Sequence, residues 1–192
     1  MMARTAITIL AAKLLLLFSF SGLPKPIQSR DHLTPQEVEL VQEAQILDQR
    51  IDVFIKAADR RLLVMRGVDA GSAKQLKQDS EKWGELPTGT QAELINDIAK
   101  ILDEAITNID DVSARDGRNP LIQKALRKLA TATTRIVDQI KPLRAQAKGD
   151  LEIGSFEQLM ENAESIVQAA SKLPPPVEKK EKGKGEKSRD KN

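Results

Sequence analysis

The fold is indicated most clearly by residues 90–112, which read TQAELINDIAKILDEAITNIDDV. Thr90 and Glu93 form the pattern of a capping box, in which the two side chains satisfy backbone N–H groups at the start of a helix. Behind them, apolar residues recur every three or four positions, the spacing of one face of an α-helix. These residues are Ile95, Ile98, Leu102, Ala105, Ile109 and Val112. The stretch therefore predicts an amphipathic helix that buries one face against other helices.

Two elements are predicted before this helix. Residues 34–66 open with another capping box, Thr34 to Glu37, and continue as one apolar stripe. A single helix of about thirty residues is expected there, roughly 45 Å long at 1.5 Å per residue. Residues 72–83 form a weaker pattern that ends in Trp83, which is expected to plug one end of the helical domain.

Two further helices are predicted after it. Asn119 caps a helix whose first residue is Pro120, and Pro142 predicts either a kink in it or an end just before it. Thr133 lies on the apolar face of this helix, where its hydroxyl is expected to bond a carbonyl one turn earlier. The last helix is predicted to open with a capping box at Ser155 and to run to residue 173.

Together these signals predict an all-α protein, an up-down bundle of four long amphipathic helices plus one short weak helix. The predicted organisation is a signal peptide at 1–21, a mobile lead-in at 22–33, a helical-bundle domain at 34–173 and a disordered tail at 174–192. The tail is rich in Pro, Lys and Glu, and such a composition cannot bury enough apolar surface to fold. A plain solubilising role is the preferred interpretation of this tail, and a tether of its lysines to an acidic envelope surface is the alternative.

The first 21 residues indicate where the protein works. Arg4 precedes an apolar run over residues 6–20, and the small residues Ser19 and Ser21 suit cleavage after position 21. Lys13 interrupts the run and leaves it too short to cross a bilayer, which needs about 20 apolar residues. We therefore expect a cleaved signal peptide and a periplasmic or secreted protein with no stable membrane span. Retention of the segment as an anchor stays open as the alternative.

The charge balance argues against nucleic acid as a partner. The chain has 30 basic and 28 acidic residues, and removal of residues 1–21 takes away two of the basic ones. The tail is net basic, so the body between residues 22 and 176 carries a net charge of −3. Nucleic-acid binding requires basic residues clustered on one surface. The chain also contains no cysteine, which excludes disulfides and a cysteine-linked lipid anchor.

The sequence offers no catalytic, cofactor-binding or metal-binding motif, so no residue is assigned to such a site. The single histidine, His32, lies in the lead-in and is expected to be solvated. Without cysteine the chain has no thiolate nucleophile and no iron–sulfur or covalent haem motif. Phosphate-binding loops, dinucleotide fingerprints and histidine–glutamate metal motifs are also missing from the sequence. We therefore expect a protein that is not an enzyme and needs no cofactor.

Carboxylates are the remaining reactive groups. Asp110, Asp111 and Asp116 lie near a turn and raise the possibility of a Ca²⁺ site, although the ligand order of an EF-hand is not met. A second set flanks two predicted helix faces, with three aspartates on one helix and two arginines on another: Asp48, Asp52, Asp59, Arg127 and Arg135. Interhelical ion pairs are the preferred interpretation of this second set, and a polar ligand-binding groove is the alternative.

One short resemblance accompanies these patterns. Residues 33–37, Leu-Thr-Pro-Gln-Glu, are similar to the Leu-Thr-x-x-Gln motif of periplasmic stress chaperones, with Glu37 in the place of the glutamine. The resemblance covers five residues and implies an exported helical protein with an apolar binding surface. No family is assigned from it.

Two classes of function follow from the sequence. The first is an exported, non-enzymatic helical-bundle protein that binds an unknown protein or envelope component, or has a structural role in the cell envelope. The second is a small-ligand- or ion-binding bundle, an unorthodox carboxylate enzyme, or a chaperone-like protein with an apolar surface. The oligomeric state and the order of the helices in space are not determined by the sequence.

Overall fold

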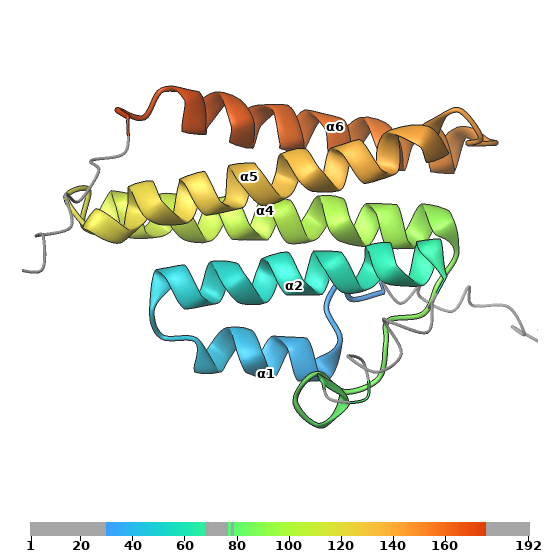
Figure 1. Cartoon of the computed structure of the whole chain (residues 1–192), viewed down its shortest axis with the longest axis horizontal. Helices are drawn as coiled ribbons and strands as arrows, with labels where there is room; N and C mark the ends of the chain where they lie inside the picture. Colours follow the sequence, from blue (N-terminus) through green and yellow to red (C-terminus); the bar gives the residue numbers. More distant parts are fainter. Residues whose placement is uncertain (1–29, 68–76, 78, 176–192) are drawn as a thin grey trace, which may run out of the picture. The chain divides into compact units, whose positions relative to one another are not determined.

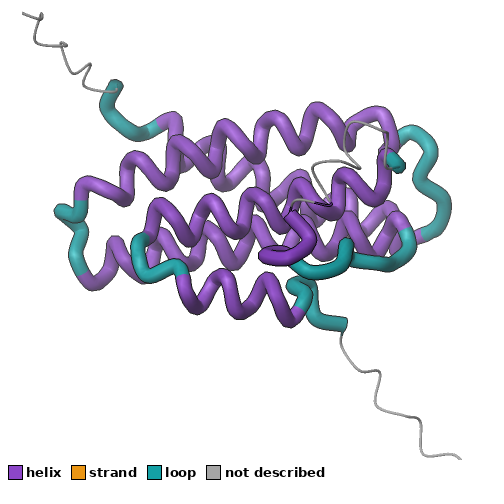
Figure 2. Tube along the Cα trace, turned by 60° about the horizontal axis from the view of Figure 1, so that its bottom comes forward, coloured by secondary structure: helices purple, strands orange, loops and turns teal. Residues whose placement is uncertain are grey.

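The computed structural model describes residues 30–67, 77 and 79–175, and the predicted signal peptide and most of the predicted tail lie outside them. The prediction of an all-α protein is confirmed, because the described chain consists of helices and loops (Figure 2). The labelled helices are α1 (Pro35–Glu43), α2 (Leu47–Arg66), α4 (Gln91–Arg115), α5 (Pro120–Arg144) and α6 (Asp150–Ser171). Residues 77 and 79–83 are also helical.

Several predicted helix starts are confirmed by their hydrogen bonds. Thr34 and Glu37 form the capping box of α1, and Thr90 and Glu93 form that of α4. The Asn119 side chain accepts a hydrogen bond from the backbone N–H of Leu121 at the start of α5. These local signals act within one turn of the chain, which is why the sequence alone locates them.

The first predicted helix is wrong in one respect, because residues 34–66 form two helices. The chain leaves helical geometry at Ala44, whose ψ is 85°, and Ile46 is extended. Helix α1 then folds back antiparallel to α2 (Figure 1). Without this break, Glu37 and Arg61 would lie about 36 Å apart along a straight helix. In the structure their side chains are in contact.

The last predicted helix begins earlier than expected. Helix α6 starts at Asp150 after Gly149, whose φ of 89° suits glycine. Ser155 is therefore not a cap but lies within the helix, where its hydroxyl donates to the Leu151 carbonyl. The acidic side chains of Asp150 and Glu152 occupy the first turn, where their negative charge interacts favourably with the positive end of the helix dipole.

One alternative for α5 is excluded, and one prediction about it is wrong. Of the two alternatives at Pro142, an end just before the proline is excluded, because the helix continues through it to Arg144. Thr133 is fully buried, but within the described residues its hydroxyl has no hydrogen-bond partner. The back-bonding expected of it is made instead by the exposed hydroxyls of Thr131 and Thr134.

The four long helices, α2, α4, α5 and α6, enclose the main apolar core. Helix α2 packs against α4 and α5, and α6 packs against the same two helices. Figure 1 shows α2 and α5 running in one direction and α4 and α6 in the other. The pairs α2–α5 and α4–α6 are therefore parallel neighbours, whereas the helices joined by a short turn, α4 to α5 and α5 to α6, run antiparallel. Fully buried core residues come from all four helices and include Phe54, Ile98, Leu129 and Leu159.

The boundaries of the core extend slightly beyond the predicted domain. Leu33, placed in the predicted mobile lead-in, is only 7% exposed and belongs to the core. Among the described residues, no helix has both the length and the apolar character that crossing a bilayer requires.

Candidate functional site

Four charged side chains, contributed by α1, α2 and α4, are buried together. We call Glu37, Arg60, Arg61 and Asp97 the buried charge cluster, since none of them is more than 3% exposed. Burying a charge is costly unless an opposite charge and hydrogen bonds compensate it. The contacts of this cluster therefore bear directly on how the helices are held.

Glu37 and Arg61 form the centre of the buried charge cluster. Arg61 Nη1 lies 2.7 Å from Glu37 Oε1, and the other carboxylate oxygen accepts from the Thr34 backbone N–H at 2.9 Å. Arg61 also donates to the carbonyls of Ala57 and His32. One guanidinium thus joins α1 and the segment before it to α2.

The second pair of contacts in the cluster is longer. Arg60 Nε lies 3.6 Å from Glu37 Oε1, and Arg61 Nε lies 3.8 Å from Asp97 Oδ2. Neither Nε makes a hydrogen bond within the described residues, so these contacts are electrostatic. The sequence did not predict the cluster. The capping box already gave Glu37 a role, and no local pattern indicates that Arg60 and Arg61 lie beside it.

Arg60 also organises the segment that precedes α4. Its guanidinium donates to the backbone carbonyls of Trp83, Gly84 and Glu85. It also lies over the Trp83 ring, 5.6 Å from the ring centre, in a cation–π contact. Burial lowers the pKa of Arg60, an effect that the charge of Glu37 opposes and that of Arg61 reinforces. Trp83 is half-buried beside α2 rather than inserted among the four long helices as a plug.

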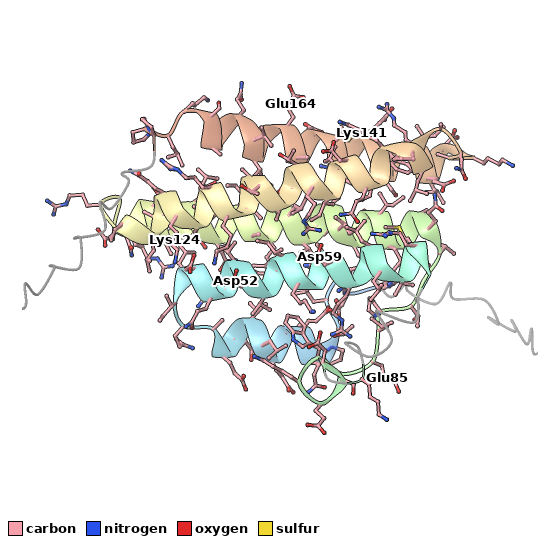
Figure 3. All side chains as sticks on the ribbon, in the orientation of Figure 1. Asp52, Asp59, Glu85, Lys124, Lys141 and Glu164 are labelled. Carbon is pink, nitrogen blue, oxygen red and sulfur yellow. The ribbon has the colours of Figure 1, made fainter. Side chains whose placement is uncertain are left out.

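The predicted ion pairs join α2 to α5, and Figure 3 labels Asp52 and Asp59 on α2 and Lys124 on α5. Arg135 pairs with Asp59 at 2.8 Å, as the sequence suggested. The other two aspartates pair with lysines that the prediction did not name. Lys128 contacts both Asp48 and Asp52 at 2.8 Å, and Lys124 contacts Asp48 at the same distance.

Arg127 makes a different contact from the one predicted. It donates to the carbonyl of Pro174, beyond the end of α6, rather than to an aspartate of α2. The helical spacing placed Arg127 beside the α2 face correctly, since it lines a hollow together with Asp52. The position of Pro174 depends on the path of the chain after α6, and the helical spacing of the sequence does not predict that path.

These ion pairs shift two pKa values. Hydrogen bonds from Lys124 and then Lys128 lower the pKa of Asp48, although partial burial acts in the opposite direction. Burial disfavours the charged form of Lys128, but its hydrogen bonds to Asp48 and Asp52 outweigh this and raise its pKa. Both shifts mean that the charged forms stabilise the contact between α2 and α5.

A cleft opens beside these groups, between α2, the segment 79–84 and α5. We call it the cationic cleft, and its volume is about 320 Å³. Its charged lining consists of four cations and two carboxylates: Lys56, Arg60, Arg66, Arg135, Asp59 and Asp79. Leu62, Leu63 and Trp83 supply apolar surface. The cleft therefore offers a positive and partly apolar lining.

The cations of the cleft differ in how they are matched. Lys56 pairs with Asp79 at 2.7 Å, as Arg135 does with Asp59. Arg66 is exposed and donates to the neutral side chain of Gln139 at 2.9 Å. Its charge has no carboxylate partner among the described residues, which leaves a guanidinium at the rim that an incoming anion can reach.

The structure also places the other residues considered from the sequence. His32 is partly buried, and its Nε2 lies 2.7 Å from Glu104 Oε2 on α4, so the prediction of a solvated histidine is wrong. The capping box and the buried Leu33 hold the backbone beside it. Asp110, Asp111 and Asp116 lie at the end of α4, and all three are exposed. Within the described residues, no group of three or more potential ligands is placed to hold a metal ion.

Comparison with known proteins found no matching family, no matching curated sequence and no matching solved structure. The function is therefore argued from the contacts described above.

Proposed function

We propose that this chain is an exported, non-enzymatic helical protein that binds an acidic segment of a macromolecular partner in the cationic cleft. The observation that carries the proposal is the unmatched charge of Arg66 in the cleft, because the other three cations, Lys56, Arg135 and Arg60, lie beside Asp79, Asp59 and Glu37. The Arg66 guanidinium at its rim has only a neutral partner among the described residues. A guanidinium in this state can form two parallel hydrogen bonds with an incoming carboxylate.

The side chains beside Arg66 support a protein segment as the ligand. Trp83 and Leu63 lie in the same lining, so a partner can bury apolar surface next to its carboxylate. Interfaces commonly combine an aromatic side chain with an arginine in this way. Arg60 stacks on Trp83 and bonds three carbonyls of residues 83–85, so the aromatic wall is held in place before a ligand arrives.

The non-enzymatic part of the proposal is supported by the use of the charged groups. The only histidine of the sequence is paired with Glu104, and the aspartates of α2 are paired with α5. The buried charge cluster joins helices rather than lining the cleft, apart from Arg60. These groups hold the fold, and the cleft remains as a place for recognition.

Binding can be tested with the short peptide acetyl-Glu-Ala-Glu-amide. Isothermal titration calorimetry gives its affinity, and the fluorescence of Trp83, the only tryptophan, reports whether it binds beside the cleft. Arg66→Gln is expected to weaken binding by about tenfold, the effect of losing one charge-assisted contact of about 1.4 kcal/mol. Arg144→Gln, an exposed arginine on α5 outside the cleft, should leave it unchanged. Equal affinities for both variants would contradict the proposal.

Export is tested separately by fractionating cells and sequencing the N-terminus. We expect a mature chain that begins near Gly22 in the soluble envelope or secreted fraction. A chain that still begins with Met1 in the membrane fraction would show an uncleaved anchor instead.

A small anionic ligand is the second candidate, because a volume of about 320 Å³ falls at the lower end of small-molecule pockets. Titration with a free dicarboxylate such as succinate distinguishes the two. Binding of succinate as tight as that of the peptide would favour the small ligand.

A further inference from the structure

A second hollow continues the cationic cleft along α2 and α5. It is lined by Asp52 and Ile55 of α2 and by residues of α5 that include Arg127, Lys128 and Arg135. Arg135 lines both hollows, so they meet at this side chain. We call the two hollows together the α2–α5 groove.

The groove is long enough for an extended segment of chain. Its lining on α2 reaches from Asp52 to Arg66, which is about 21 Å at 1.5 Å per residue. Figure 1 shows that α2 and α5 run in the same direction, and residues of both helices line the two hollows. An extended peptide rises about 3.3 Å per residue, so about seven residues span the groove.

Charge is concentrated in the groove. Six cations and three carboxylates line it, whereas the body of the chain as a whole is net negative. Towards its two ends lie Arg66 and Arg127, which donate to the neutral oxygens of Gln139 and Pro174. Neither guanidinium has a carboxylate partner among the described residues. The positive charge that a ligand can reach is therefore greatest at the two ends.

We infer that the α2–α5 groove binds an extended acidic protein segment with carboxylates about 20 Å apart, one at Arg66 and one at Arg127. The inference rests on the proposed function and specifies its partner. Between the two arginines, Asp59 of the lining repels a continuous line of phosphates. A peptide with neutral residues in its middle avoids that repulsion, which favours a protein segment over a nucleic acid.

The experiment compares two peptides by isothermal titration calorimetry at low salt. The short one is acetyl-Glu-Ala-Glu-amide, which the cationic cleft alone can hold. The long one is acetyl-Glu-Ala-Glu-Ala-Ala-Ala-Glu-amide, whose terminal carboxylates lie about 20 Å apart when the chain is extended. We expect the long peptide to bind about five- to tenfold more tightly, the gain from one further charge-assisted contact.

Variants assign that gain to the second hollow. Arg127→Gln is expected to reduce the affinity for the long peptide to that for the short one, without changing the latter. Arg66→Gln should weaken the binding of both peptides, and Arg144→Gln should leave the binding of both unchanged. Far-UV circular dichroism and the urea midpoint of each variant establish that the fold is retained.

Each outcome bears on a separate statement. Equal affinities for the two peptides, or an Arg127→Gln variant that still prefers the long one, would overturn the inference and leave the proposed function standing. Failure of the short peptide to bind would overturn both. A twelve-residue thymidine oligonucleotide that binds more tightly than the long peptide would identify a polyanion as the ligand and overturn the choice of a protein segment.

Discussion

Replacing Glu37 by glutamine tests whether the buried charge cluster holds α1 against α2. Glu37 is fully buried, and its carboxylate accepts from Arg61 at 2.7 Å and from the Thr34 N–H at 2.9 Å. Glutamine keeps the shape but removes the charge, so Arg61 is left with Asp97, 3.8 Å from its Nε, as its carboxylate partner in the cluster, and Arg60 loses its contact with the charge of Glu37. Removing one partner of a buried ion pair costs about 3–5 kcal/mol. We expect Glu37→Gln to lower the free energy of unfolding by this amount.

Urea unfolding followed by circular dichroism measures the loss. Asp138→Asn is the matched control, because it removes the same charge from a pair with Lys141 whose side chains are both more than half exposed. Such a surface pair contributes at most about 1 kcal/mol. A double-mutant cycle of Glu37→Gln with Arg61→Gln isolates their interaction, for which we expect a coupling energy of roughly 1–3 kcal/mol.

Hydrogen exchange shows where the stability is lost. Among the labelled helices, α1 packs only against α2, so its amides should open more readily once Glu37 is neutral. A loss of 3–5 kcal/mol corresponds to exchange about 150- to 5,000-fold faster in the residues of α1. A cost below about 1 kcal/mol, equal to that of Asp138→Asn, would refute the reasoning that this cluster holds α1.

Three further predictions concern the rest of the fold. Because the pKa of Asp48 is lowered on folding, its ion pairs stabilise the protein above its ordinary pKa of 3.8, and this stabilisation is lost as the pH falls through the lower folded pKa. The raised pKa of Lys128 means that its contribution is lost only above pH 10.5. Asp48→Asn should therefore destabilise the protein at pH 7, and by progressively less as the pH falls below 3.8, measured by urea unfolding at a series of pH values. Leu129→Ala should cost about 2–5 kcal/mol because Leu129 is fully buried, and a cost below 1 kcal/mol would contradict the packing described. Thr90→Ala should cost about 1 kcal/mol by removing the cap of α4, and an unchanged thermal midpoint would argue against that cap.

The candidate site was predictable only in part. The spacing of Asp48, Asp52 and Asp59 on one helix and of Arg135 on another was enough to predict interhelical ion pairs, because helical periodicity decides which residues share a face. The choice of Lys124 and Lys128 as partners depends on the register of α5 against α2. The cationic cleft also requires Trp83 beside α2, and that position follows from long-range bonds to Arg60.

The sequence by itself determined the helical class, the starts of α1, α4 and α5, and the apolar faces that form the core. Caps and periodicity act over a few residues, so they can be read without knowing the fold. The tertiary structure decided the break after α1, the early start of α6 and the parallel pairing of α2 with α5. It also brought Glu37 to Arg61 across 24 positions of the chain. The free energy of such contacts depends on which elements meet in space, and no local pattern in the sequence specifies that.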